Sequence, residues 1–234
     1  MVGILSLVLF KNYLITNSKK YKKKLLYNLN FDIMFWDCYP NNLQKKKPTT
    51  QNAPLERILS YFRYKRTIKY IRNKKVLDFG CGIKNWNSEF IGKYPKLIHG
   101  VERSKQSSEE KDNVVEIFRD IEDLPLNDYE IVLSMAVFEH IDPFILIDIL
   151  RELTDKTSKN AIIFGTTPTP LGRPVLEFLS YKLKLIDESQ IRDHEIYYDD
   201  FWFNKILSKT NWILSYYKTF QFGLNSEFIL SKKD

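Results

Sequence analysis

The stretch Val76-Leu77-Asp78-Phe79-Gly80-Cys81-Gly82 is a short apolar run that ends in an acid and a glycine-rich turn. Glycine lacks a Cβ, so such a turn lets the backbone approach a ligand closely at the edge of a parallel sheet. Ile83-Lys84-Asn85 follows Gly82, so the third glycine of the dinucleotide fingerprint is missing. This absence argues against NAD as the ligand.

Short apolar runs alternate with helical stretches on the C-terminal side of residue 75. This alternation predicts βαβ units and a largely parallel sheet. Near the end, Gly223-Leu224-Asn225 separates two further apolar runs and predicts a hairpin, which adds an antiparallel strand at one edge. We therefore predict an α/β fold: a Rossmann-like, mostly parallel seven-stranded sheet with helices on both faces. The expected strands are residues 76–79, 97–101, 114–118, 131–134, 161–165, 212–220 and 227–230.

The N-terminal third is strongly basic. Residues 1–75 contain 17 Lys and Arg against three acids, whereas the remaining residues contain 19 basic and 26 acidic side chains. The apolar run over residues 1–10 is too short to span a bilayer. We interpret this region as an interfacial or packing helix that could touch an anionic membrane surface, with simple coverage of the domain as the alternative.

The domain boundary is predicted from the segment KKKPTTQNAP at residues 45–54, whose two prolines and polar residues are typical of a linker. An amphipathic helix is expected over residues 55–73, and its basic face is more often solvated than a binding surface. The predicted organisation is a basic N-terminal helical extension with linker over residues 1–53 and a second domain over residues 54–234.

The cysteines and histidines are few. The two cysteines, Cys38 and Cys81, fit a reduced, cytoplasmic protein better than a disulfide-bonded one. The three histidines, His99, His140 and His194, are widely spaced and predict no metal site.

Acidic residues follow two successive predicted strands. Glu102 ends the segment His99-Gly100-Val101-Glu102, where a carboxylate can accept both ribose hydroxyls of a nucleoside. Asp120 follows the third strand, where it could accept the adenine amino group while Ile121 packs on the ring. This spacing fits one adenosine.

The fourth segment, YEIVLSMAVFEHI at residues 129–141, is expected to be a central strand that leads into a loop and a short helix. Together the four segments resemble the class I S-adenosylmethionine-dependent methyltransferases, in particular the small-molecule branch called type 11. The resemblance implies S-adenosylmethionine as cofactor and covers about 160 residues. Lys84 departs from the family, which usually has glycine there.

The resemblance also implies a set of cofactor-binding residues. Asp78, Gly80 and Gly82 would hold the methionine end, Glu102 the ribose, Asp120 with Ile121 the adenine, and Met135 with Ala136 the sulfonium region; Cys81 and Arg103, next to these positions, complete the set.

A second resemblance concerns residues 166–174, 176–187 and 191–194, which are similar to methyltransferases encoded among surface-polysaccharide biosynthesis proteins. It implies that residues 166–205 form a substrate cap, and that the acceptor is a small molecule, namely a hydroxyl of a sugar or glycan intermediate.

Methylation of a hydroxyl calls for a base, and His140 and His194 are the candidate catalytic residues. His140 could instead only shape the pocket, paired with Glu139 or Asp142, and His194 could lie in a solvated acidic patch. His99 is expected to be structural.

Two alternatives remain open. The basic extension would suit an RNA or protein methyltransferase, but Ser134-Met135-Ala136-Val137 lacks the Asn/Asp-Pro-Pro-aromatic pattern of base and amide methylation, so a nucleic-acid partner is not expected. A non-catalytic scaffold on the same fold is the other alternative. Nothing in the sequence indicates an oligomeric state.

Overall fold

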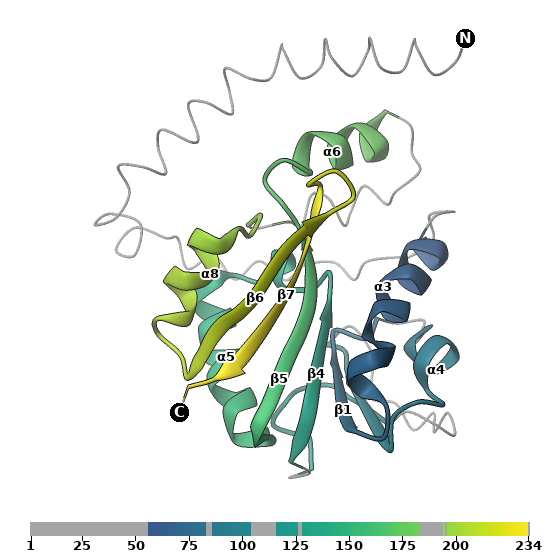
Figure 1. Cartoon of the computed structure of the whole chain (residues 1–234), viewed down its shortest axis with the longest axis vertical. Helices are drawn as coiled ribbons and strands as arrows, with labels where there is room; N and C mark the ends of the chain where they lie inside the picture. Colours follow the sequence, from purple (N-terminus) through teal and green to yellow (C-terminus); the bar gives the residue numbers. More distant parts are fainter. Residues whose placement is uncertain are drawn as a thin grey trace. The chain divides into compact units, whose positions relative to one another are not determined.

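The computed structural model describes residues 56–82, 86–103, 116–125, 128–182, 194 and 196–233 (Figure 1). All of them belong to the unit that spans Pro48–Asp234. The predicted extension and linker, with the apolar run, lie outside the described residues, and the boundary at residue 54 stays a prediction. Within the described ranges, no helix is both long enough and apolar enough to cross a membrane.

Seven strands form one sheet in the order β3-β2-β1-β4-β5-β7-β6. The first five strands run parallel, whereas β7 is antiparallel to both of its neighbours, β5 and the edge strand β6. The predicted fold class is therefore confirmed. The strands are β1 (Lys75–Phe79), β2 (Leu97–Val101), β3 (Glu116–Phe118), β4 (Tyr129–Met135), β5 (Thr157–Pro168), β6 (Trp212–Phe220) and β7 (Asn225–Lys232).

Helices cover both faces of this sheet, with α3 (Glu56–Ile71) and α4 (Trp86–Ile91) on one side and α5 (Pro143–Lys156) and α8 (Asp200–Leu207) on the other (Figure 1). Helix α3 matches the amphipathic helix predicted from the sequence. Its buried residues Tyr64 and Ile71 join a core cluster with Val76, Ile98 and Leu133 from the strands. Removing these apolar surfaces from water holds α3 over the centre of the sheet.

Helix α5 begins at a well-formed cap, because the Asp142 carboxylate accepts hydrogen bonds from the backbone N–H groups of Phe144 and Ile145. On the same face, the fully buried Trp212 of β6 donates its indole N–H to the carbonyl of Leu150, at 2.8 Å. This bond connects the edge strand to the middle of α5.

Helix α6 (Arg173–Tyr181) lies beyond the carboxyl end of β5 (Figure 1). The turn of the β6–β7 hairpin supports its start, since Thr169 donates its hydroxyl to the carbonyl of Gly223 at 2.6 Å and its N–H to that of Leu224 at 3.0 Å. The predicted cap segment, residues 166–205, thus begins at the strand ends where a cap would have to lie. Its role as a cap stays a prediction.

Candidate functional site

The glycine turn after β1 has the backbone that its sequence predicts. Gly80 and Gly82 have φ angles of +74° and +80°, a region that residues with a side chain rarely adopt. A Cβ at Gly80 would also lie 2.5 Å from a methyl carbon of Val137. Glycine at this position therefore lets the turn pack directly against the loop that follows β4.

Asp78 lies below this turn and is completely buried. Its Oδ2 accepts a hydrogen bond of 2.8 Å from the hydroxyl of Tyr64, which comes from α3. Burial, and then the charge of Asp78, raise the pKa of Tyr64, so this hydroxyl stays protonated and keeps donating. Asp78 thus anchors the turn to α3, and Tyr64 is a supporting residue that sequence reasoning missed.

Glu102 connects the ends of β1 and β2. Its side chain is half-buried, and its Oε2 accepts a hydrogen bond of 3.0 Å from the backbone N–H of Gly82. The structure therefore brings the second predicted acid to the glycine turn. The side chain of Cys81, the residue between Gly80 and Gly82, is buried against Gly100. A Cβ added at Gly100 would lie only 2.8 Å from the Cys81 Sγ.

The predicted cofactor-binding residues Arg103, Asp120 and Ile121 follow the ends of β2 and β3. Arg103 donates from its Nε to the Asp120 carboxylate at 3.1 Å, in an exposed ion pair, while Ile121 is buried. This ion pair connects the segments that follow β2 and β3, although an exposed pair of this kind adds little stability.

Met135 and Ala136 close the central strand at the same edge of the sheet. Ala136 has a φ of +61°, and its N–H donates to the carbonyl of Thr166 at 2.9 Å. Met135 is buried in the core cluster. The sharp turn at Ala136 redirects the chain from β4 into the 3-10 helix η1 (Phe138–His140).

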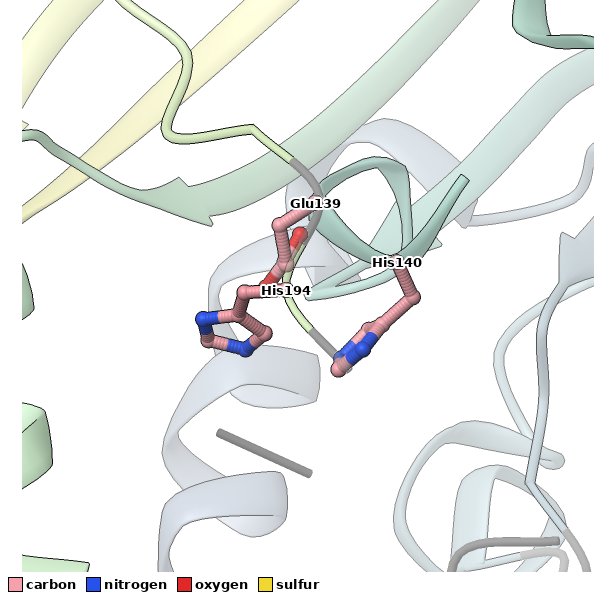
Figure 2. Close-up of side chains that lie close together, drawn as sticks. All are labelled: Glu139, His140 and His194. Carbon is pink, nitrogen blue, oxygen red and sulfur yellow. The ribbon is translucent and has the colours of Figure 1, made fainter. Parts of the chain in front are cut away.

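Figure 2 shows Glu139 and His140 of η1 converging with His194, which precedes α8. One ligand-type atom from each side chain lies within 4.8 Å of the other two. The rings of His140 and His194 meet edge to face, with centroids 4.6 Å apart. The two predicted base candidates, far apart in the sequence, therefore belong to one cluster.

Glu139 differs from Glu102 and Asp120 because its side chain is only 1% exposed. Burial raises the pKa of its carboxyl to about 7, against smaller lowerings by a backbone hydrogen bond, by the charge of Arg63 and by the Thr167 hydroxyl. Among the described residues, no hydrogen-bond donor reaches its Oε2. A buried carboxylate oxygen of this kind is costly unless something compensates it.

His194 is held by a second layer of polar groups. Its Nδ1 lies 2.9 Å from the hydroxyl of Tyr197, and the guanidinium of Arg173 lies 5.5 Å from the centre of the Tyr197 ring. Arg173 in turn donates to Glu177 on the next turn of α6, at 2.9 Å. Burial raises the pKa of Tyr197, so its hydroxyl remains neutral.

His99 does not join this cluster. It is buried in β2, where its Nδ1 lies 2.6 Å from the hydroxyl of Tyr129. This agrees with the structural role that its sequence context predicts.

Sequence reasoning did not identify Glu139, Tyr197 or Arg173 as site residues. The run Met135-Ala136-Val137-Phe138-Glu139 contains one signal that could have indicated a buried carboxylate, an acid directly after apolar residues. For Tyr197 and Arg173 no local signal existed, because their relation to His194 arises from the packing of α6 near the segment before α8.

The sheet order, the glycine turn and the acid at the next strand end define the fold of the S-adenosylmethionine-dependent methyltransferases. Residues 51–211 match the model of the methyltransferase domain family, which covers more than half of the chain. The chain therefore belongs to the methyltransferase domain family. The expected enzyme class and its methyl donor, S-adenosylmethionine, are confirmed at this level.

Solved structures show the same fold. A SAM-dependent methyltransferase from Archaeoglobus fulgidus is 15% identical, with 75% of this chain and 94% of that chain covered and a TM-score of 0.54. Magnesium protoporphyrin IX methyltransferase from Synechocystis, solved with bound SAH, is 13% identical, with 75% and 84% covered and a TM-score of 0.51. No curated protein matches the sequence.

Proposed function

We propose that this protein transfers the methyl group of S-adenosylmethionine to a hydroxyl of a small-molecule acceptor, a sugar or glycan intermediate of surface-polysaccharide biosynthesis. The observation that carries the proposal is the cluster in which Glu139 and His140, from the segment after Met135 and Ala136, meet His194 from the segment before α8. It places groups that can accept a proton next to the loop where the resemblance puts the sulfonium.

On the donor side, the residues at the strand ends fit an adenosyl group. Gly80 and Gly82 add no side chains to the turn, and Glu102 offers a carboxylate at the end of the neighbouring strand. The buried Ile121 lies one residue beyond Asp120 and supplies an apolar surface for the adenine. When bound, S-adenosylmethionine supplies an activated methyl group on a positively charged sulfur.

On the acceptor side, the protein has to align a hydroxyl oxygen with the methyl carbon and the sulfur, and alignment of this kind accounts for much of the acceleration. The acceptor oxygen forms the new bond to carbon, the carbon–sulfur bond breaks with its electron pair going to sulfur, and the hydroxyl proton must leave. In a site without a metal ion, His140 and His194 are the proposed acceptors of this proton. General base catalysis of this kind is typically worth ~100- to 10,000-fold in rate.

The sugar or glycan acceptor is supported by the resemblance of residues 166–194 and by the position of α6 beyond the carboxyl end of β5 (Figure 1). Ligands of open α/β sheets bind outside the carboxyl ends of the strands.

The test is methyl transfer from labelled S-adenosylmethionine to three acceptor pools: sugar nucleotides, lipid-linked glycans and RNA. We expect label in one of the two carbohydrate pools, and a loss of label with the variant His140→Gln while cofactor affinity stays unchanged. Label in RNA alone, or in no pool despite cofactor binding, would contradict the proposal.

We further propose that the basic N-terminal extension docks a cytoplasmic protein on an anionic membrane surface, where lipid-linked intermediates would be within reach. Its support is the excess of Lys and Arg in residues 1–75 together with the apolar run at residues 1–10. Deleting residues 1–47 should abolish sedimentation with vesicles of anionic lipid and leave cofactor binding unchanged. Undiminished sedimentation of the truncated protein would exclude this role.

A further inference from the structure

Glu139, His140 and His194 combine two imidazoles with one carboxylate, the ligand types that zinc binds in many catalytic sites. We propose that these three side chains bind a divalent transition-metal ion, with zinc as the best match. The cluster is compact, since one ligand-type atom of each residue lies within 4.8 Å of the other two (Figure 2). Small side-chain rotations would bring the three atoms to the ~2 Å metal distances of such a site.

No metal site was predicted, because the histidines are widely spaced along the sequence. The fold nevertheless brings two of them together. Spacing reveals a metal site only when the ligands lie on one local element. Here two ligands come from η1, and the third comes from the segment before α8.

The state of Glu139 is the second observation that points to a cation. Its side chain is 1% exposed, and its Oε2 has no hydrogen-bond donor within the described part of the chain. Burying a carboxylate without compensation is costly, and a bound divalent ion would compensate it.

Tyr197 gives His194 the arrangement that metal-bound histidines usually have. Its hydroxyl lies 2.9 Å from Nδ1 of His194, where it can accept the proton of that nitrogen. The ring then presents the lone pair of Nε2, and the partner of the other nitrogen fixes the tautomer and orientation. Arg173, above the Tyr197 ring, holds this partner in place.

The role of this metal ion rests on the proposed function. Three protein ligands would leave one coordination position for the acceptor's hydroxyl oxygen. A cation lowers the pKa of a hydroxyl that it binds, so that the proton leaves to water as the oxygen attacks the methyl carbon. With the metal bound, His140 and His194 act as ligands, and no oxidation or reduction takes place.

Metal binding can be measured without any acceptor. The untagged full-length protein would be stripped with a chelator and titrated with Zn²⁺ against a chromophoric competitor, and with Co²⁺ followed by visible absorption. We expect one ion per chain. His140→Ala and His194→Ala should each weaken binding by more than about 100-fold, because a lost second-layer partner alone costs about 10- to 100-fold. Tyr197→Phe should fall within that second range.

His99→Gln is the matched control, since it removes the third histidine of the chain outside the cluster, and its metal affinity should equal that of the wild type. Cofactor affinity and melting temperature, measured on every variant, establish that each one is folded. Absence of binding by the wild type, or unchanged affinity in folded His140→Ala and His194→Ala, would overturn the metal site. Cofactor binding and methyl transfer by the same metal-free protein would then leave the proposed function intact.

Discussion

At the residue scale, Glu102 links the end of β2 to the glycine turn, because its carboxylate accepts a hydrogen bond from the N–H of Gly82. Replacing Glu102 by Gln removes the charge that the ribose hydroxyls would use. Hydrogen bonds to charged groups are worth about 1.5–3 kcal/mol, so the affinity for S-adenosylmethionine should fall by about 10- to 100-fold in calorimetry. Asp123→Asn removes an exposed charge from the rim and should bind as the wild type does. Equal affinities of Glu102→Gln and the control would contradict the assignment.

Substitution of Gly80 tests whether the turn requires a residue without a side chain. Gly80→Ala would force alanine into a φ of +74° and its Cβ against Val137, so we expect a loss of stability of at least about 1–2 kcal/mol. The double variant Gly80→Ala/Val137→Ala removes the collision but not the backbone strain, so urea denaturation should show partial recovery. Full recovery would mean that only the space matters, and no initial loss would mean that the turn is formed differently.

His99 predicts a dependence of stability on pH. Burial lowers its pKa below 6.5, so in acid the unfolded chain takes up a proton that the folded chain refuses. Stability is therefore full above pH 6.5 and is lost as the pH falls through that value. Relative to His99→Gln, the wild type should lose unfolding free energy between about pH 7.5 and about pH 5.5. A difference that is constant over this range would contradict the lowered pKa.

At the scale of the elements, the bond from Trp212 to Leu150 connects the edge strand β6 to α5. Trp212→Phe keeps an aromatic ring but removes one of two donors to the Leu150 carbonyl, which still accepts from the Thr154 hydroxyl at 3.0 Å, so we expect a cost of about 0.5–1.5 kcal/mol in urea denaturation. Tyr216→Phe removes an exposed hydroxyl of the same strand that donates to Glu227, and because this bond is exposed to water its effect should stay within about 0.5 kcal/mol. Similar losses in the two variants would show that the bond contributes nothing.

The strands show which elements the sequence could predict. Strand β2 has the predicted ends, since the apolar run at residues 97–101 is bounded on both sides by polar residues. Strand β5 was expected only at residues 161–165 but spans Thr157–Pro168, because β4 pairs with its start at Thr157 and β7 pairs along it from Ile162 to Pro168. Such pairing depends on a partner far along the chain, which local patterns do not contain.

The same distinction applies to the site. The glycine turn and Glu102 could be predicted, because both follow directly from the ends of two neighbouring parallel strands. The meeting of His140 with His194 and the burial of Glu139 depend on how the segment before α8 packs against η1. Each histidine was proposed separately from its own neighbours in sequence, and only the fold joins them.

At the scale of the whole molecule, one edge of the sheet carries both halves of the proposed reaction. The turn after β1 and the end of β2 form the proposed donor side, and Glu139 and His140 after β4 form the proposed acceptor side together with His194 from the segment before α8. The contact between Gly80 and Val137 links the two halves directly.

A crystal structure of the full-length protein with the demethylated product, S-adenosylhomocysteine, tests the central claim most directly. The account predicts the ribose on Glu102, the adenine beside Asp120 and Ile121, and the sulfur facing the loop at Ala136, toward Glu139, His140 and His194. Product bound elsewhere, or an empty site between the glycine turn and Glu102 at saturating ligand, would contradict it.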